Sequence, residues 1–297
     1  MMKRTLYFGN PAHLSTRNEQ LIIKRDNQID TTIPIEDIGF VILDHYDILI
    51  TKTILQKLTE NNSAVIITNE KHMPSGWLMP LEGNSTQSKV FQAQCKASDS
   101  LKNRLWKQII QAKIQNQSKL LKTLDIAYST MDNHVKKVKN GDPENREAQA
   151  AKYYWKHLFS PFNFKRERFG GPPNNLLNYG YAILRAMVGR ALVGSGLLPS
   201  IGLHHRSQYN PFPLADDFIE PFRPFVDEVV VNLALSDENN LDLTKETKRK
   251  LLEIPTLDVY LNNEFRPIMN ALSSSTASLA RCFLLEEKEI IFPSICP

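Results

Sequence analysis

The sequence has few cysteines and no long hydrophobic run, and each of these shortages excludes some classes of protein. Three cysteines, Cys95, Cys282 and Cys296, lie far apart without a CxxC pair, which supports neither a disulfide framework nor a zinc ribbon. No stretch approaches the roughly 20 apolar residues that a membrane span requires, and none follows the Lys3-Arg4 pair as it would in an export signal. We expect a cytoplasmic protein that is neither exported nor embedded in a membrane.

Several motifs of common enzyme classes are also missing from the sequence. It contains no GxxxxGK[ST] phosphate loop, no GxGxxG after a strand, no HExxH and no GxSxG. These absences argue against nucleotide hydrolysis, dinucleotide redox chemistry, zinc proteolysis and serine hydrolysis.

The composition is that of an ordinary folded protein, and its length of 297 residues favours two domains. The net charge of +4 indicates an anionic partner only mildly. Lysine and arginine concentrate between residues 96 and 190, at Lys102, Arg104, Lys107, Lys113, Lys119, Lys122, residues 136–139 and residues 165–168. Each group fits a solvated helix face as well as it fits contact with nucleic acid.

Short β-branched groups occupy the N-terminal quarter and are separated by polar turns. They lie at residues 5–8, 21–23, 32–35, 39–43 and 64–67. This spacing predicts a small sheet domain over residues 1–75, with one helix at residues 51–61 that ends at the Asn61-Asn62 pair.

The composition changes at residues 74–87, which are rich in turn-forming residues. We place a linker and the start of the first long helix at 76–95, and a larger all-α domain at 96–297. Apolar residues at helical spacing predict helices at 88–123, 148–157 and 176–193, with a break at 139–143 before a helix that Asn145 opens. The tail at 273–297 is expected to be loosely held. The predicted fold class is therefore α+β.

Three positions carry side chains suited to phosphodiester chemistry, which needs a divalent metal held by carboxylates and an occasional imidazole. They are Glu147, the His204-His205 pair, and the acids at 216–220. Each has an ordinary structural alternative. Glu147 could simply favour the positive end of a helix dipole, and a histidine of the pair could be packed and hydrogen-bonded.

Within the acidic group, Asp217 and Glu220 are three residues apart and would share a helix face. Two observations compete with a metal site here. Glu220 could pair with Arg223, and Pro221 favours an extended backbone at Glu220, which would interrupt a helix.

Taken together, three blocks resemble one family. They read EAQAAKYYW at 147–155, PNNLLNYGY at 173–181, and GLHH at 202–205 followed by LADDFIEPFRPFVD at 214–227. In their order and spacing they are similar to the CRISPR-associated integrase, the universal spacer-acquisition subunit of CRISPR immunity. The stretch at 204–210 and the EPFRP sequence look most like the version from type II systems.

The resemblance implies a metal-dependent DNA integrase and endonuclease, in which the 3′-hydroxyl of a short DNA fragment attacks a phosphodiester of the repeat array. It implies that Glu147, His205 and Glu220 are catalytic and hold Mg²⁺ or Mn²⁺, with Asp217 as a neighbouring acid and His204 as the alternative to His205. Many relatives carry aspartate at the position of Glu220. Charge and nearness in sequence suggest these contacts to the DNA backbone: Arg146, Lys152, Arg168, Arg185 and Arg190.

The resemblance further implies several partners. The DNA partners are the incoming fragment and the CRISPR repeat. The protein partners are a second copy of the chain, in a homodimer formed through the β-rich domain, the small ferredoxin-like CRISPR adaptation subunit, and other type II CRISPR proteins.

Two other functions fit the residues. One is a structure-specific, metal-dependent DNA repair nuclease that uses the same ligands. The other is a non-catalytic DNA-binding scaffold in which the acids are structural.

Overall fold

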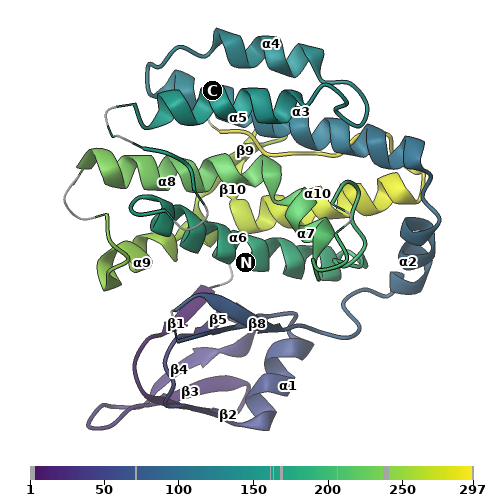
Figure 1. The fold of residues 1–297 in the computed structure, drawn as a ribbon. Helices are drawn as coiled ribbons and strands as arrows, with labels where there is room; N and C mark the ends of the chain where they lie inside the picture. Colours follow the sequence, from purple (N-terminus) through teal and green to yellow (C-terminus); the bar gives the residue numbers. More distant parts are fainter. Residues whose placement is uncertain are drawn as a thin grey trace. The chain divides into compact units, whose positions relative to one another are not determined.

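The computed structural model describes residues 4–70, 72–160, 162, 164–167, 170–205, 207–236 and 241–295. The chain divides into two compact units, Met1–Ser85 (unit 1) and Thr86–Pro297 (unit 2). Unit 1 is built on sheets and unit 2 mostly on helices (Figure 1). The predicted α+β fold class is confirmed.

Unit 1 holds two four-stranded sheets. In one, β1, β5 and β7 are parallel and β8 pairs antiparallel with β7; the other has the order β4-β3-β2-β6. The strands are β1 (Arg4–Phe8), β2 (Ala12–Arg17), β3 (Gln20–Lys24), β4 (Thr31–Pro34), β5 (Ile38–Leu43), β6 (Ile48–Ile50), β7 (Ala64–Thr68) and β8 (Pro74–Leu78).

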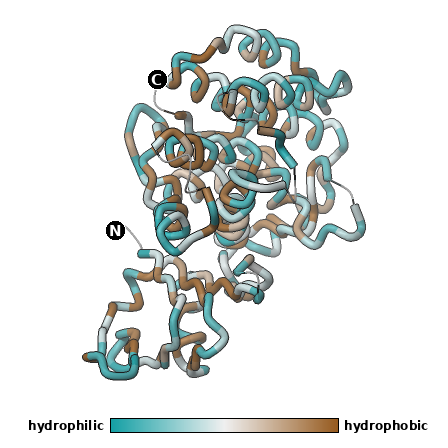
Figure 2. The backbone as a smooth tube through the Cα atoms, turned by 60° about the vertical axis from the view of Figure 1, so that its left-hand side comes forward, coloured by the Kyte–Doolittle hydropathy of each residue, from teal (hydrophilic) through white to brown (hydrophobic). Residues whose placement is uncertain are grey.

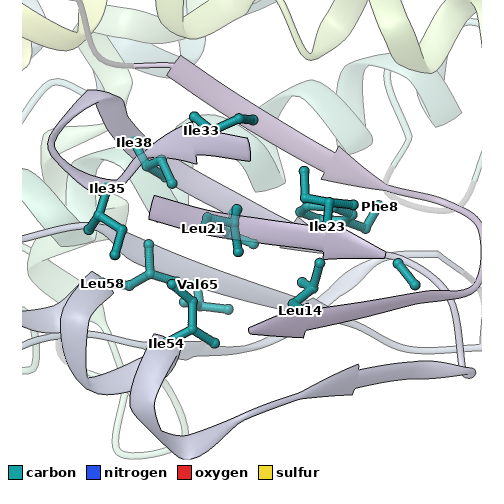
Figure 3. Close-up of a cluster of buried hydrophobic side chains, with 12 residues drawn as sticks. Phe8, Leu14, Leu21, Ile23, Ile33, Ile35, Ile38, Ile54, Leu58 and Val65 are labelled. Carbon is teal, nitrogen blue, oxygen red and sulfur yellow. The ribbon is translucent and has the colours of Figure 1, made fainter. Parts of the chain in front are cut away.

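The core of unit 1 lies between its sheets and helix α1 (Lys52–Glu60) (Figure 3). Leu14 and Leu21 come from one sheet, Ile38 and Val65 from the other, and Ile54 from the helix, and all five are buried. The alternation of buried and exposed residues along β2 and β3 gives the second sheet a single apolar face, as expected for an antiparallel pair with one side on the core.

The structure contains the strands and the helix predicted for unit 1. It also contains three strands that were not predicted, β2, β6 and β8. Helix α1 ends at Glu60, and Asn62 adopts a positive φ of 55°, as expected for the Asn61-Asn62 stop. Strand β2 is rich in polar residues and β8 contains proline and glycine, so neither gives a β-branched run. The short apolar strand β6 was not among the predicted groups. Strand β8 reaches into the segment expected to be a linker.

Unit 2 consists of helices packed around buried apolar residues. Its α-helices are α2 (Gln87–Cys95), α3 (Asp99–Thr123), α4 (Ser129–Lys137), α5 (Arg146–Leu158), α6 (Asn174–Gly194), α7 (Pro213–Phe218), α8 (Arg223–Ser236), α9 (Lys245–Leu251) and α10 (Ile268–Phe283). Figure 2 shows hydrophobic and hydrophilic stretches alternating within single helices, as amphipathic helices require. Within the described ranges, every helix is too short or too polar to cross a lipid bilayer.

The expected helix at residues 88–123 is two helices. Its break falls between α2 and α3, where Ser98 caps α3 by accepting the N–H of Leu101 at 3.2 Å. The expected helices at 148–157 and 176–193 lie within α5 and α6.

Two features of unit 2 differ from expectation. A hairpin of β9 (Asp258–Leu261) and β10 (Glu264–Pro267) adds a two-stranded sheet to a domain that was expected to be all-α. The prediction of a loosely held tail at 273–297 is wrong for its described residues. Residues 273–283 all belong to α10, and Ile290 and Ile295 are buried.

Candidate active site

Glu147 lies in the first turn of α5, and the residues just before it fix its position. Asn145 adopts a left-handed conformation with φ of 50° and accepts the N–H of Ala148 at 3.3 Å. Asp142 accepts the N–H groups of Arg146 at 2.8 Å and of Glu147 at 2.9 Å. Two side chains thereby satisfy N–H groups that have no partner within the helix.

Glu220 begins a short 3-10 helix, η2 (Glu220–Phe222), which joins α7 to α8. The extended backbone expected at Glu220 is wrong, because the chain remains helical through Pro221. Ile219 before it has φ of −68° and ψ of −26°. A proline in the first turn of a helical segment costs little, since the missing N–H would have no partner there. Helical geometry carries Glu220 into the interior of unit 2, where it is buried.

Lys113, in the middle of α3, joins the two glutamates. Its Nζ lies 2.6 Å from Oε1 of Glu147 and 2.5 Å from Oε2 of Glu220. The Lys113 and Glu220 side chains are only 9% and 7% exposed. Two carboxylates from different helices therefore meet at one buried cation.

Arg223 adds a second positive charge to this group. Its Nε lies 3.1 Å from Oε1 of Glu220. Burial opposes charge on Glu220, but Arg223 and Lys113 outweigh it and lower the pKa of that carboxyl below its ordinary value. Burial likewise opposes charge on Lys113, and the negative charges of Glu220 and Glu147 outweigh it, so the pKa of Lys113 is raised. Glu220 and Lys113 thus each favour the charged form of the other.

Asp217 organises the loop that carries the histidines. Its fully buried carboxylate accepts the N–H groups of Leu203 at 2.6 Å, His204 at 3.0 Å and His205 at 3.2 Å. Gly202 permits this approach, because a Cβ there would lie 2.9 Å from Oδ2 of Asp217 and 2.8 Å from the carbonyl oxygen of His205.

The two histidine rings have different partners. His204 stacks on Trp106 with ring centroids 4.4 Å apart. His205 Nδ1 lies 2.5 Å from Oδ1 of Asp217, and this hydrogen bond raises the pKa of His205 above its ordinary value. With Nδ1 paired to a carboxylate, Nε2 is the nitrogen of His205 that remains to bind a metal or another group.

Asp227 lies four residues after Arg223 on α8 and belongs to a separate buried hydrogen-bond network. Its Oδ2 accepts the Tyr154 hydroxyl at 2.8 Å, and its Oδ1 accepts the Tyr181 hydroxyl. Burial raises the pKa of Asp227 to about 6, against the lowering effect of both tyrosine hydrogen bonds. The ring of Tyr181 also lies 4.7 Å from the guanidinium of Arg223, so this network borders the glutamate site.

Asp227 makes stability depend on pH. An unfolded aspartate loses its proton near 3.8, whereas the folded one keeps it to about 6, so stability from this group falls as pH rises between those values. A shift of this size corresponds to roughly 3 kcal/mol. We expect Asp227→Asn to remove that loss. Urea unfolding at pH 4, 5, 6 and 7 tests this, and equal pH slopes for wild type and variant would contradict it.

The residues proposed to contact the DNA backbone have varied settings. Arg146 hydrogen-bonds to Glu144 and Gln149, and Arg185 forms an ion pair with Asp216 at 2.5 Å. Lys152 is exposed on α5, and burial lowers the pKa of the half-buried Arg190. Arg168 lies outside the described residues.

The structure thus brings Glu147 and Glu220 together and ties His205 to Asp217. Within the described residues, no three His, Cys, Asp or Glu side chains form a group that could hold a metal ion, and Lys113 stands between the two glutamates. The expectation of solvated or DNA-contacting basic residues missed the role of Lys113. One sequence feature could have indicated that Lys113 is buried: it lies three and four residues after Ile110 and Ile109, on the same face of the helix as these buried apolar residues.

The fold and the site define a class: a β-rich unit joined to a helical unit that carries buried acids and a histidine–aspartate pair. A solved structure described as a casposase bound to integration product has this fold, with a TM-score of 0.80 at 20% identity over 98% of this chain and 92% of that chain. A chain of a Cas6-RT-Cas1–Cas2 complex gives a TM-score of 0.73 at 19% identity, over 97% of this chain and 36% of the longer one.

Sequence comparison gives the family. The family model for CRISPR associated protein Cas1 matches residues 6–267. A protein named CRISPR-associated endonuclease Cas1, from Neisseria meningitidis, is 34% identical over 100% of this chain and 98% of its own length. The chain belongs to the Cas1 family, and the resemblance seen in the sequence is confirmed.

Proposed function

We propose that the protein is a metal-dependent DNA integrase and endonuclease of CRISPR adaptation. The 3′-hydroxyl oxygen of a short DNA fragment attacks a phosphodiester phosphorus of the CRISPR repeat and forms a new P–O bond. The bond from that phosphorus to the 3′-oxygen of the repeat strand breaks and leaves a 3′-hydroxyl there, so the transesterification consumes no nucleotide. The observation that carries this proposal is the convergence of Glu147 and Glu220 on one buried cation, Lys113. Family membership and the relative named an endonuclease support it.

The donor types of Glu147, Glu220 and His205, carboxylate oxygen and imidazole nitrogen, are those that suit Mg²⁺ or Mn²⁺. Two carboxylates already share one positive charge at short distance, and hard divalent cations prefer oxygen ligands with an occasional imidazole. Asp217 orients His205 so that Nε2 remains to complete the set. A metal held by Glu147, His205 and Glu220 would activate the attacking hydroxyl and neutralise charge on the phosphate.

Other side chains of the site position these ligands. Asp142 and Asn145 hold the start of α5 and hence Glu147. Asp217 holds the loop of His205 through its backbone N–H groups, as an auxiliary acid and not as a ligand. Arg223 pairs with Glu220 and keeps it charged in a buried setting.

The DNA backbone is expected to contact basic residues of unit 2. Arg146, Lys152, Arg168, Arg185 and Arg190 remain the candidates, and each lost phosphate contact would weaken binding and reduce its salt dependence.

For protein partners we propose a homodimer through unit 1 and a complex with the small ferredoxin-like adaptation subunit. The matching fold in a structure described as a Cas6-RT-Cas1–Cas2 complex supports a complex with a second adaptation subunit. The homodimer rests on the resemblance alone, and a monomeric mass by light scattering would contradict it.

A strand-joining assay tests the proposed reaction. A labelled fragment is incubated with a repeat-bearing plasmid and Mg²⁺ or Mn²⁺, and the label is expected to join the plasmid at the repeat. The matched control is the same fragment with a 3′-deoxy end, which lacks the attacking hydroxyl and should not join. The second candidate is a structure-specific nuclease, which the word endonuclease in the name of the Neisseria relative supports. Cutting of branched DNA without any joining would favour that candidate and overturn the integrase.

A further inference from the structure

The last described stretch of the chain, residues 288–295 (the C-terminal segment), packs against the part of the fold that carries Glu220. After α10 the chain runs back alongside α3 (Figure 1). The ring of Phe292 lies 5.5 Å from that of Phe218 and 6.3 Å from that of Phe222. These two phenylalanines flank Glu220 in sequence, so the segment supports the backbone on both sides of it.

Asn116 links the C-terminal segment to this backbone. Its amide nitrogen donates to the carbonyl oxygen of Pro221 at 2.8 Å and to that of Pro293 at 3.1 Å. Its side-chain oxygen accepts the N–H of Ile295 at 3.3 Å. Asn116 is 2% exposed, so water offers no substitute for these bonds.

Helix α3 therefore holds the Glu220 region in two ways. Lys113 binds the side chain of Glu220, and Asn116, three residues later on the same helix, binds the carbonyl group of the next residue, Pro221. Side chains three apart lie on one helix face, which places both contacts on the same side of α3.

Residues that do not contact the Glu220 region anchor the rest of the C-terminal segment. Gln108 donates to the carbonyl oxygen of Lys288 at 3.0 Å and accepts the N–H of Ile290 at 2.8 Å. Ser278 accepts the N–H of Ile291 at 2.9 Å. The segment thus keeps anchors of its own, and loss of Asn116 alone does not release all of it.

We propose that Asn116 is a positioning residue of the active site. The C-terminal segment acts through Asn116, and through Phe292 packed on Phe218 and Phe222, to fix Glu220 in the geometry that binds a metal ion. This inference rests on the proposed function. Partners that orient a metal ligand typically contribute 10- to 100-fold to metal affinity or activity. Asn116 and Phe292 contribute in this way without touching the metal or the DNA.

The test compares Asn116→Ala with Gln108→Ala. Both variants remove hydrogen bonds to the same segment, but only Asn116 also binds Pro221. We expect Asn116→Ala to weaken Mn²⁺ binding, measured by calorimetry without DNA, and strand joining by about 10- to 100-fold. DNA affinity in the absence of metal should stay unchanged. Gln108→Ala should keep wild-type values in all three measurements.

Two further variants keep the test decisive if Asn116→Ala does not fold. Phe292→Ala should reduce Mn²⁺ affinity, and Phe292→Leu, which retains an apolar side chain against Phe218 and Phe222, should restore most of it. Equal Mn²⁺ affinity in Asn116→Ala and Gln108→Ala, or in both Phe292 variants, would overturn the inference. If wild type binds Mn²⁺ but never joins DNA, the proposed function fails, while the comparison of Mn²⁺ affinities still decides the role of Asn116.

Discussion

Replacing Glu220 with glutamine is expected to reduce strand joining by more than about 100-fold, because even residues that only orient a metal ligand contribute 10- to 100-fold. Glutamine keeps the size of the side chain but removes the negative charge that meets Lys113 Nζ at 2.5 Å and Arg223 Nε at 3.1 Å. The expected loss lies in turnover and in Mn²⁺ affinity, and DNA affinity without metal should be retained.

The same change has a cost in stability that must be separated from catalysis. Glu220→Gln leaves Lys113 and Arg223 with one negative partner fewer in a buried site, and breaking a buried ion pair typically costs about 3–5 kcal/mol. Thermal unfolding shows whether the variant is folded at the assay temperature. The control is Glu228→Gln on α8, a partly buried glutamate outside the site, which should join DNA like wild type. Unimpaired joining by folded Glu220→Gln would contradict a role for this carboxylate.

Replacing Lys113 with methionine is expected to destabilise the metal-free protein by about 3 kcal/mol. Glu147 and Glu220 then lose the cation that holds them together, although Glu220 retains Arg223. A divalent metal ion supplies the missing charge and binds only the folded state, so it should recover much of this stability. Thermal unfolding with and without Mn²⁺ should therefore give a larger metal-induced shift for Lys113→Met than for wild type.

Lys248→Met provides the matched comparison for this experiment. Lys248 is also buried, and its ammonium lies 5.8 Å from the ring centroid of Tyr179 and outside the glutamate site. Its loss can change stability, but the Mn²⁺-induced shift should equal that of wild type. A Lys113→Met protein that is as stable as wild type without metal would show that the lysine does not hold the two carboxylates.

Local sequence signals were sufficient for the helix that carries Glu147. The turn chemistry before Asn145 and the small residues after Glu147 predicted the start of α5, because capping and helix propensity act over a few neighbouring residues. The block around Asp217 and Glu220 gave the family, and it also contained the ion pair with Arg223 that was the alternative interpretation. The ion pair is present, and the metal-ligand interpretation stays a prediction that is compatible with it, since an acid paired with an arginine can also face a metal.

The contacts between distant segments could not be predicted in the same way. Lys113 meets Glu147 and Glu220 only because three helices pack together, and nothing in the spacing of these residues indicates that packing. The C-terminal segment lies near the end of this sequence and contains Pro293, which suggested a loose tail, yet Asn116 and Gln108 bind its backbone groups. Hydrogen bonds to backbone depend little on the sequence of the bound segment. Such anchoring therefore leaves no sequence pattern.

The measurement that tests the central claim most directly is a crystal structure with Mn²⁺, located by its anomalous scattering. Glu147, His205 and Glu220 are predicted to bind one ion, with Nε2 as the ligand atom of His205. Lys113 Nζ is expected to leave its place between the two carboxylates. An ion bound elsewhere, or Lys113 still bridging Glu147 and Glu220 at saturating Mn²⁺, would contradict the account.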